Sequence, residues 1–321
     1  MSRAAASVGA LACAVFGLAA ALLAAMGEPL DWAAVLAGTG IERELLLHFR
    51  LPRVLTACLT GAVLGLAGTA LQVVLRNPLA SPDVIGFGAG AGAGAAVAII
   101  IAGSLDAVLP GALLGGALAT ALILSLAWRG GLPPNGLIII GVALSLMLTA
   151  ATDVLLSFSP GIQAAETARF LTGSFAGSDW QGVALLAGAA AAGGLLLGLQ
   201  SYTINRLDLG DDIATAQGLN VRRTRGVMVA SSAALISVSV AATGPLPFLA
   251  FLAGPLARAV TGVGGTQLGA AALTGALIAL GADALARSWP SATTLPAGVF
   301  TAALGGLAML VIVLRQGERR P

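Results

Sequence analysis

The residues of this chain that could do chemistry are fourteen carboxylates, sixteen arginines, one histidine and two cysteines. A single histidine, His48, excludes histidine-dependent catalytic triads and histidine-based metal clusters. Cys13 and Cys58 both fall in apolar segments, so we expect neither a disulfide framework nor a zinc site, which needs four soft ligands close together. We therefore expect no catalytic residue, no metal site and no bound cofactor. Charged contacts are the chemistry that remains.

The carboxylates avoid the middles of the apolar runs. Asp83, Asp106, Asp153, Asp179 and Asp283 each fall in a loop or within about a turn of the end of a run, and the other acids belong to polar segments. Ion-coupled and proton-coupled carriers usually hold an acid near the bilayer centre. The lack of a central acid disfavours proton-coupled transport and an intramembrane aspartyl protease. Because no Walker-type sequence is present, nucleotide energy would have to come from another polypeptide.

Two arginines, Arg50 and Arg53, flank Pro52 at the start of the second apolar run. Proline is tolerated in a first helical turn, where its missing N–H costs little. One interpretation is that both side chains snorkel to the membrane interface. The other is that they form a cationic docking point for acidic side chains of an external partner. Both interpretations stay open on the residues alone.

The polar stretch 207–222 has the pattern of a short helix. Asp211 and Asp212 suit a helix N-terminus, and Gly218 suits the position just after a C-cap. Arg222 then leads into the next apolar run. A solvated loop would explain the charges alone, whereas a helix, a glycine stop and a second turn suit insertion into a groove of a cytoplasmic partner.

The composition indicates the kind of fold that positions these residues. The chain is 58% hydrophobic and 9% charged, with a mean hydropathy of +0.97. That excludes a soluble enzyme, a disordered scaffold and a nucleic-acid binder, since soluble domains are about 25% charged. With about 20 apolar residues per crossing, we predict an all-α polytopic membrane protein of about ten transmembrane helices. The predicted spans are 4–26, 52–75, 84–103, 107–128, 136–156, 180–202, 226–243, 247–263, 268–287 and 296–315.

The first of these spans could be misread as a cleaved signal peptide. Its apolar run of about 22 residues exceeds the 7–15 of a signal sequence, which favours a retained span. Cytoplasmic loops carry an excess of positive charge, and placing both termini inside puts eleven of the sixteen arginines there. The five arginines left outside are Arg43, Arg50, Arg53, Arg169 and Arg287.

Glycines recur four residues apart in two of the spans, at Gly61 and Gly65 and again at Gly86, Gly90 and Gly94. We interpret them as sites of close helix–helix approach in lipid. A phosphate-binding loop is the competing interpretation of GFGAGAGAGA, but no lysine follows it and the glycines continue into an apolar span.

Four stretches, at residues 50–93, 171–180, 209–225 and 281–306, resemble FecCD-type permeases, the membrane subunits of ABC importers for iron–siderophore complexes and cobalamin. The resemblance covers nearly the whole chain. In the first stretch the matching residues are Arg50, Pro52, Arg53, Gly61, Gly68, Gln72, Asn77, Pro78, Leu79, Ala80, Pro82 and Gly86.

This resemblance implies a type II ABC importer permease fold, with residues 1–321 forming one transmembrane permease domain and a cytoplasmic coupling loop at about 206–225. It implies a second permease subunit, identical or related, two cytoplasmic ABC ATPase subunits and an extracytoplasmic substrate-binding protein. The cargo would be an iron chelate, most often a ferric siderophore, and no nucleic acid is involved. The protein would be multi-pass in the inner or plasma membrane with both termini cytoplasmic.

The resemblance also implies roles for individual residues. Docking of the binding protein falls on Arg50, Arg53 and Arg287. A cytoplasmic gate falls on Pro134 and Asn135. Coupling to the ATPase falls on Gly210, Asp211, Asp212, Ala214, Gly218, Leu219 and Arg222.

The chain departs from the family pattern at four places. It has Gly254-Pro255 where a Pro-His pair is frequent, and Gly262-Val263-Gly264-Gly265-Thr266 where a charged Asp-His-Arg turn follows. It also has Phe170 where tryptophan is common, and Gly306-Leu307 in place of Ala-Pro. These departures keep the class but leave the cargo and the partner permease open. The alternatives are cobalamin or haem import by the same mechanism, an ATPase-independent secondary transporter and, least favoured, a structural or channel protein.

Overall fold

The computed structural model describes residues 3–25, 35, 41–77, 81–103, 107–128, 131–290 and 295–317. Within these ranges the chain is helical and contains no strand. The helices are α1 (Arg3–Ala25), α3 (Ile41–Leu45), η1 (Leu46–Arg50), α4 (Leu51–Val74), α5 (Pro82–Ile85), α6 (Phe87–Val97), η2 (Ala98–Ala102), α7 (Val108–Trp128), α8 (Pro134–Phe158), α9 (Gly161–Leu171), α10 (Trp180–Leu199), α11 (Ser201–Asp208), α12 (Asp211–Ala216), α13 (Val221–Thr243), α14 (Leu249–Thr261), α15 (Leu268–Ser288) and α16 (Ala297–Gly317).

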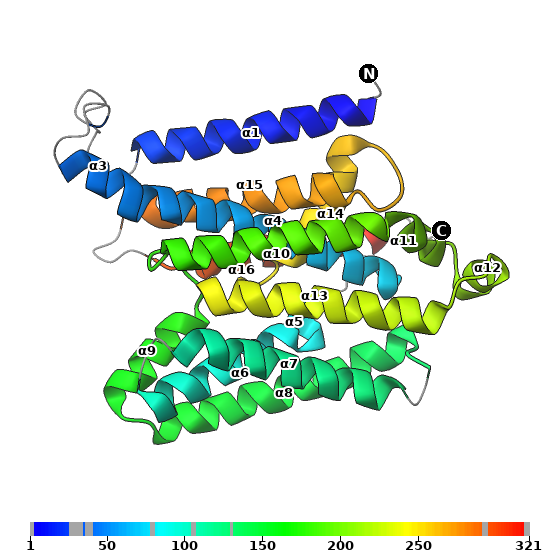
Figure 1. Ribbon diagram of the computed structural model, residues 1–321, viewed down its shortest axis with the longest axis horizontal. Coiled ribbons are helices and arrows are strands. Elements are labelled where there is room, and N and C mark those ends of the chain that lie inside the picture. The colour runs from blue at the N-terminus through cyan, green and yellow to red at the C-terminus, as the bar shows by residue number, and fades with distance from the viewer. Residues whose placement is uncertain are drawn as a thin grey trace.

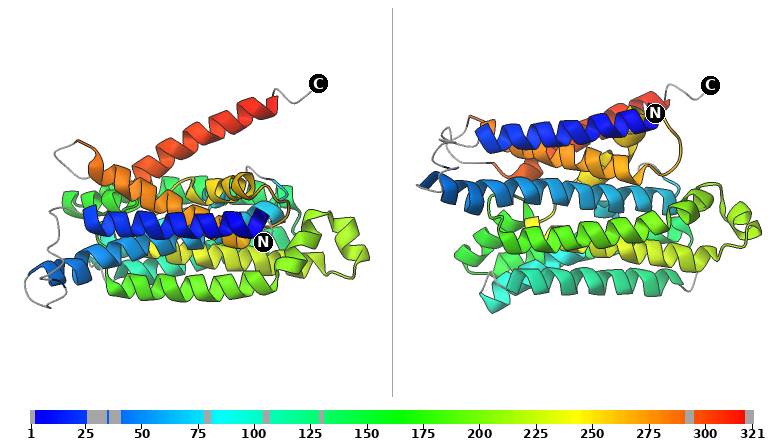
Figure 2. Two further views of the ribbon diagram at one scale, coloured as in Figure 1. Left: turned by 90° about the horizontal axis from the view of Figure 1, so that it is seen from above. Right: turned by 45° about the horizontal axis from the view of Figure 1, so that its top comes forward.

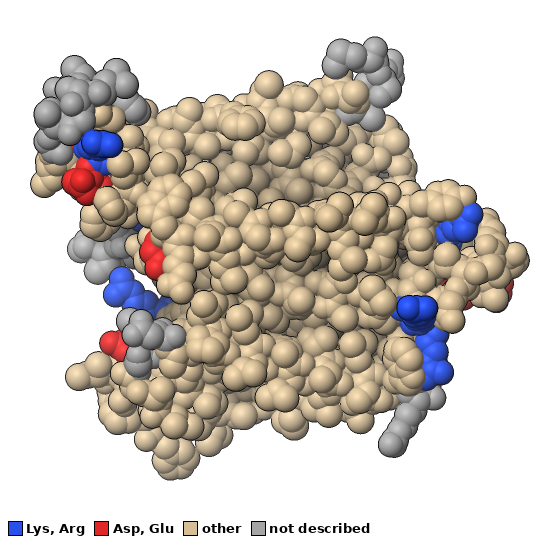
Figure 3. All heavy atoms as spheres, viewed as in Figure 1, with Lys and Arg blue, Asp and Glu red and all other residues tan. Residues whose placement is uncertain are grey.

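Each of the ten predicted spans coincides with a helix, which confirms the predicted fold class. Seven helices are long and apolar enough to cross a membrane, and three further apolar helices are shorter. The long helices run side by side, with α4 in contact with α10, α13, α14 and α15 at the centre (Figure 1). On the face seen in Figure 3 the charged side chains gather at the two ends of the bundle, and the band between them is uncharged.

We call these ends the α3 end and the α12 end, after the helices that lie there. The first residues of α1 and the last residues of α16 lie at the α12 end (Figures 1 and 2). Arg206, Arg222 and Arg225 are at the α12 end with α11, α12 and the start of α13, and Arg53 and Arg287 are at the opposite end. The arginines therefore divide between the ends as predicted, although Arg129, Arg319 and Arg320 lie outside the described residues.

The second span begins eleven residues before the predicted start. Helix runs without a break from Ile41 through η1 into α4, so Pro52 lies inside a continuous helix and not at a free N-terminus. The π-helical turn Leu46–Arg50 ends two residues before the proline. A π-bulge is one way for a helix to accommodate a residue that lacks an N–H and crowds the preceding turn. The arginines Arg50 and Arg53 are consequently held on a rigid helix.

The third and eighth spans are short because each begins inside the bundle. After α4 the chain turns back through α5, and Gly86, with φ +88°, packs against Gly141 and Ser145 near the middle of α8. Likewise Phe248, the N-cap of α14, contacts Gly305 near the middle of α16. The N-termini of α6 and α14 therefore lie near mid-depth, with α6 running to the α3 end and α14 to the α12 end.

The glycine repeats lie at helix–helix contacts, as predicted. A Cβ atom on Gly61 would come within 2.2 Å of a carbonyl oxygen of α15, and one on Gly65 within 2.3 Å of another. Gly90 and Gly94 approach the backbone of α7 in the same way, at 2.9 and 2.1 Å. Only glycine permits these helix backbones to touch, so the run GFGAGAGAGA is a packing surface.

Candidate functional site

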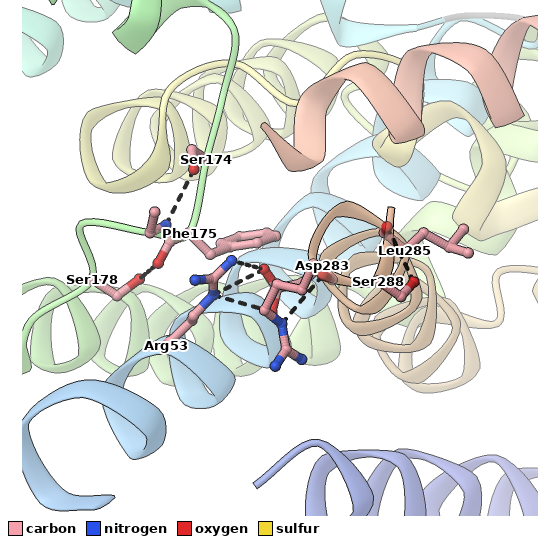
Figure 4. Close-up of polar contacts among 9 residues, drawn as sticks. Arg53, Ser174, Phe175, Ser178, Asp283, Leu285 and Ser288 are labelled. Atoms are coloured by element: carbon pink, nitrogen blue, oxygen red, sulfur yellow. Dashed lines mark hydrogen bonds and ion pairs between the residues drawn. The ribbon is translucent and has the colours of Figure 1, made fainter. Parts of the chain in front are cut away.

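An ion-paired cluster joins α4 and α15 at the α3 end. The carboxylate of Asp283, only 1% exposed, accepts hydrogen bonds on Oδ1 from Arg53 Nη2 at 2.7 Å and Nε at 3.0 Å (Figure 4). Arg287, one turn later on α15, places its Nε 3.1 Å from Oδ2. One buried carboxylate thus neutralises part of the charge of two arginines, whose side chains are 19% and 18% exposed.

Arg50 lies at the same end but makes a different contact. The residue is 7% exposed, and its Nη1 donates to the backbone oxygen of Leu23 in α1 at 3.1 Å. The three arginines implied for docking therefore converge, yet each is held by this chain's own atoms. Arg287 Nη2 is buried and has no hydrogen-bond partner among the described residues. Donors are thus in excess over acceptors in this cluster.

The stretch 171–180, one of the four on which the resemblance rests, packs beside this cluster. Phe175 is fully buried, with its ring next to Arg53 and Asp283 (Figure 4). Its loop is closed by two local hydrogen bonds, from Ala176 N to Ser174 Oγ and from Ser178 Oγ to the oxygen of Phe175. Three of the four stretches on which the resemblance rests, 50–93, 171–180 and 281–306, therefore meet in one structure.

At the α12 end, α12 has the predicted short-helix geometry. Gly218 adopts φ +80° directly after the C-cap and donates its N–H to Thr215 O at 2.9 Å. Leu219 donates to Ala214 O at 3.0 Å, which completes a Schellman motif. Ala214 is buried against the bundle, while Leu209 and Ile213 expose 59% and 48% of their surface. The segment is thus a braced turn with an apolar tip.

The carboxylate of Asp211 braces this turn internally. It pairs with Arg76 at the end of α4 and, at 2.7 Å, with Arg225 of α13. The side chain of Arg225 is 3% exposed and also donates to the backbone oxygen of Leu132 at 3.0 Å. Arg222 is engaged too, because it stacks over Trp128 and donates to that residue's backbone oxygen at 2.5 Å. Asp211 and Arg222 therefore hold the segment implied for coupling in place, and Asp212 is the exposed acid of the pair 211–212.

The two residues implied for the gate begin α8. Pro134 is the first helical residue, and Asn135 is exposed on the next position. Leu132, which accepts the bond from Arg225, is fully buried and lies two residues before Pro134. A chain of direct contacts thus links α12 to the start of α8 through Arg225.

The expectation that no acid lies near the middle of the bundle was wrong for Asp83. Its Oδ2 accepts hydrogen bonds from Phe248 N and Ser81 Oγ, both at 3.0 Å, and its backbone oxygen faces Ser145 of α8. The residue does lie near a helix end, as predicted, since it is in the first turn of α5, but that end lies inside the bundle because the chain turns back after α4. An anion next to the N-terminus of α14 is favoured by the helix dipole.

A polar cavity of about 360 Å³ opens at the α12 end of α4. Gln72 on its wall donates to Phe251 O at 2.9 Å and accepts from Arg258 at 3.3 Å. Among the described residues no group of three or more histidine, cysteine or acidic side chains could hold a metal ion. The two thiols, Cys13 and Cys58, are free.

The comparison with known families decides the class of this chain. The profile of the FecCD transport family matches residues 8–315. The chain belongs to the FecCD transport family. This FecCD permease is a multi-pass membrane protein and the transport component of a metal-chelate ABC importer, in which hydrolysis of ATP belongs to a separate subunit.

Known relatives are similar along most of their length. The ferric enterobactin transport system permease protein FepG of Escherichia coli (strain K12) is 36% identical over 275 residues, which cover 85% of this chain and 83% of the relative. The vitamin B12 import system permease protein BtuC of Vibrio cholerae is 32% identical over 286 residues, covering 88% and 86%. A solved metal-chelate type ABC transporter in an inward-facing conformation matches with a TM-score of 0.87 at 27% identity, covering 96% of this chain and 98% of its own.

Sequence reasoning missed the residues that hold these sites together. Asp283 was seen only as an acid near a span end, although its position four residues before Arg287 is the spacing of a helical ion pair. The contact with Arg53 spans 230 positions and has no local signal. The same is true of Asp83 with Phe248, 165 positions apart, and of Gln72 with Arg258. In this FecCD permease such pairs could not be predicted from the sequence, because they form only when the helices pack.

Proposed function

We propose that this permease carries a ferric siderophore into the cytoplasm across the inner or plasma membrane, with the α12 end and both termini on the cytoplasmic side. The observation that carries the proposal is the 36% identity with FepG, a permease for ferric enterobactin. Import of cobalamin by the same mechanism is the alternative, supported by the 32% identity with a vitamin B12 permease, and haem is a further one. A secondary carrier is not favoured for a member of an ABC importer family.

The proposed complex contains a second permease, identical or related, beside this chain. The second half of α16 leaves the bundle (Figure 2) and exposes an apolar face on which Leu307, Leu310 and Leu314 are 63%, 56% and 61% exposed. The outward face of α8 is also uncovered, with Ile139 and Leu146 at 68% and 67%. We propose that the substrate passes between the two permeases along these two helices.

We propose that α12 transmits the motion of an ATPase subunit to the gate. Its exposed tip, Leu209 and Ile213, supplies the apolar surface for a groove on that subunit, and Gly210 and Gly218 allow the two turns that bound it. Movement of α12 would pull on Arg225 through Asp211 and thereby shift the segment that precedes Pro134 and Asn135. The coupling segment then acts through its bracing contacts and not through free charges.

We propose that the arginines at the α3 end steer an acidic binding protein by their net charge. Arg50, Arg53, Arg287 and Asp283 carry a net charge of +2. Because these side chains are mostly buried, this net charge, and not a new hydrogen bond, would act on the partner. Long-range charge of this kind acts chiefly on the association rate. If the arginines only snorkelled to the membrane interface, their side chains would be equally exposed but would not change the association rate of a partner.

A charge series tests the docking proposal. Arg53→Gln should slow association of the binding protein and Asp283→Asn should speed it, each by about threefold to tenfold at low salt, with the differences shrinking as salt rises. Arg206→Gln makes the same charge change at the opposite end and is the control. Association rates by surface plasmon resonance, taken with the detergent-solubilised transporter, report the result. If both variants associate at the rate of the control, the arginines return to the snorkelling interpretation.

Uptake by a purified system tests the function itself. The permease is reconstituted in proteoliposomes with its ATPase and binding protein, and accumulation of radiolabelled iron is measured with ATP on the cytoplasmic side. ATP-dependent uptake of a ferric siderophore supports the proposal. Uptake of labelled cobalamin or haem alone would assign the alternative cargo, and uptake without ATP or ATPase would contradict the importer mechanism.

A further inference from the structure

Helix α8 carries an acidic side chain on its uncovered face. Asp153 is exposed and lies five residues before the helix ends at Phe158. It is 18 positions after Asn135, which is five full turns at 3.6 residues per turn, so both residues share one face about 27 Å apart. Ile139 and Leu146, 68% and 67% exposed, lie between them on that face. A single carboxylate thus interrupts an otherwise apolar surface near the α3 end.

This carboxylate differs from the other two acids within the apolar helices. Asp283 is neutralised by two arginines, and Asp83 accepts hydrogen bonds from Phe248 and Ser81. For Asp153 the structure records only a bond from Ser157 Oγ to its backbone oxygen, and among the described residues no cation lies within 4.0 Å of its side chain. Among the residues that the structure describes, its charge is therefore not balanced by a cation.

The surroundings of Asp153 argue against contact with lipid. Phe158 is 88% exposed and Ile162, at the start of α9, is 77% exposed, so large apolar side chains lie farther toward the α3 end than the acid does. An ionised acid inside the apolar layer is costly, and such residues usually face water or a bundle interior. The face that bears Asp153 must therefore border water or a partner.

We infer that Asp153 is a specificity-determining carboxylate on the outer part of the substrate route, where it favours ferric chelates that carry a cationic group. This inference rests on the proposed function, which places the route along α8. The carboxylate attracts an ammonium group on the ligand shell and repels chelates with net negative charge. With an identical second permease, two such carboxylates would face the route. The substrate class is then a ferric hydroxamate with a free amine, in preference to an anionic catecholate or citrate complex. The inferred cargo is a ferric siderophore, as proposed above, but differs in charge from the anionic ferric enterobactin for which FepG is named.

A matched pair of chelates isolates this charge effect. Three hydroxamates neutralise ferric iron, so a trihydroxamate chelate with a terminal amine is cationic, and its N-acetylated form is neutral with nearly the same shape. The complete transporter is reconstituted in proteoliposomes, and ATP-dependent uptake of each complex is measured at saturating binding protein. The affinity of the binding protein for each complex is measured separately, because a change in the permease does not alter it.

The expected result is a preference that depends on residue 153. Asp153→Asn should lower the ratio of cationic to neutral uptake by about fivefold, the upper range for one exposed ion pair. Asp153→Arg should reverse the preference. Glu166→Gln removes an exposed acid from α9 at the same end and should leave the ratio unchanged.

Three outcomes would overturn the inference. An unchanged ratio in Asp153→Asn, with uptake intact, refutes the specificity role and leaves the proposed function standing. Equal loss of both complexes, with the permease pair dissociated on size exclusion, assigns Asp153 to contact with the second permease. Failure of the unaltered transporter to take up either complex with ATP refutes the proposed function and the inference with it.

Discussion

Removal of the buried charge at Asp283 should destabilise the α3 end of the bundle. Asp283→Asn keeps the shape of the side chain but leaves Arg53 and Arg287 without their shared anion. Breaking a buried ion pair by removing one partner costs about 3–5 kcal/mol. The lower end, about 3 kcal/mol, applies because each guanidinium retains 19% or 18% exposure and can turn partly toward water. On the scale of soluble domains this lowers the unfolding midpoint by about 6–12 °C.

The chain offers its own probe for this measurement. Cys58 is a free, half-buried thiol on α4, the helix that carries Arg53, so a thiol-reactive fluorophore reports the opening of that helix on heating in detergent. Cys13 on α1 is exposed and is first replaced by serine. Asp179→Asn is the matched control, since it removes an acid at the same end while asparagine still accepts the N-cap bond from Gly182.

A second variant separates charge from packing. When Arg53 and Arg287 are replaced by methionine together with Asp283→Leu, all three charges of the ion-paired cluster are removed together, and most of the lost stability should return. If Asp283→Asn has the same unfolding midpoint as the Asp179→Asn control, the reasoning is refuted. The carboxylate would then contribute nothing to the contact between α4 and α15. If the triple variant is instead less stable than Asp283→Asn, the charged cluster is a net stabilising element compared with apolar side chains.

The other predictions concern contacts that only the packed bundle creates. Asp83→Ala should lower stability by about 1–3 kcal/mol because the N–H of Phe248 and the hydroxyl of Ser81 lose their acceptor. Asp83→Asn keeps an acceptor and should cost less. Equal unfolding midpoints of these two variants in the thiol assay would contradict this. Gly61→Ala should cost about 1–3 kcal/mol, since its Cβ would lie 2.2 Å from a carbonyl of α15, whereas Gly9→Ala has nothing within 4 Å and should be neutral in the same melting assay. Arg225→Met should reduce uptake per ATP hydrolysed at least severalfold while Arg206→Met does not, measured as paired uptake and ATPase rates in proteoliposomes; an unchanged ratio would remove Arg225 from the coupling route.

The sequence alone was sufficient for everything that depends on local composition. Apolar runs of about 20 residues are costly to place anywhere but in a bilayer or a core, so all ten spans could be predicted. The short helix α12 and its glycine stop were also predictable, because Asp211, Asp212 and Gly218 act within a few residues of one another. The glycine repeats could be assigned to packing since no lysine or polar helix start accompanies them.

Tertiary structure decided where helix ends lie in depth and which charges meet. Asp83 is near a helix end in the sequence but at mid-depth in space, because the chain re-enters the bundle after α4. From the sequence, Arg53 and Arg287 were interpreted as exposed cations, whereas the packing of α4 on α15 places Asp283 between them. Conversely, Asp153 resembled the other terminal acids in the sequence, whereas in the bundle no described cation lies within 4.0 Å of its side chain. The physical reason is that pairing energy depends on distance and burial, and neither is set by neighbours in the sequence.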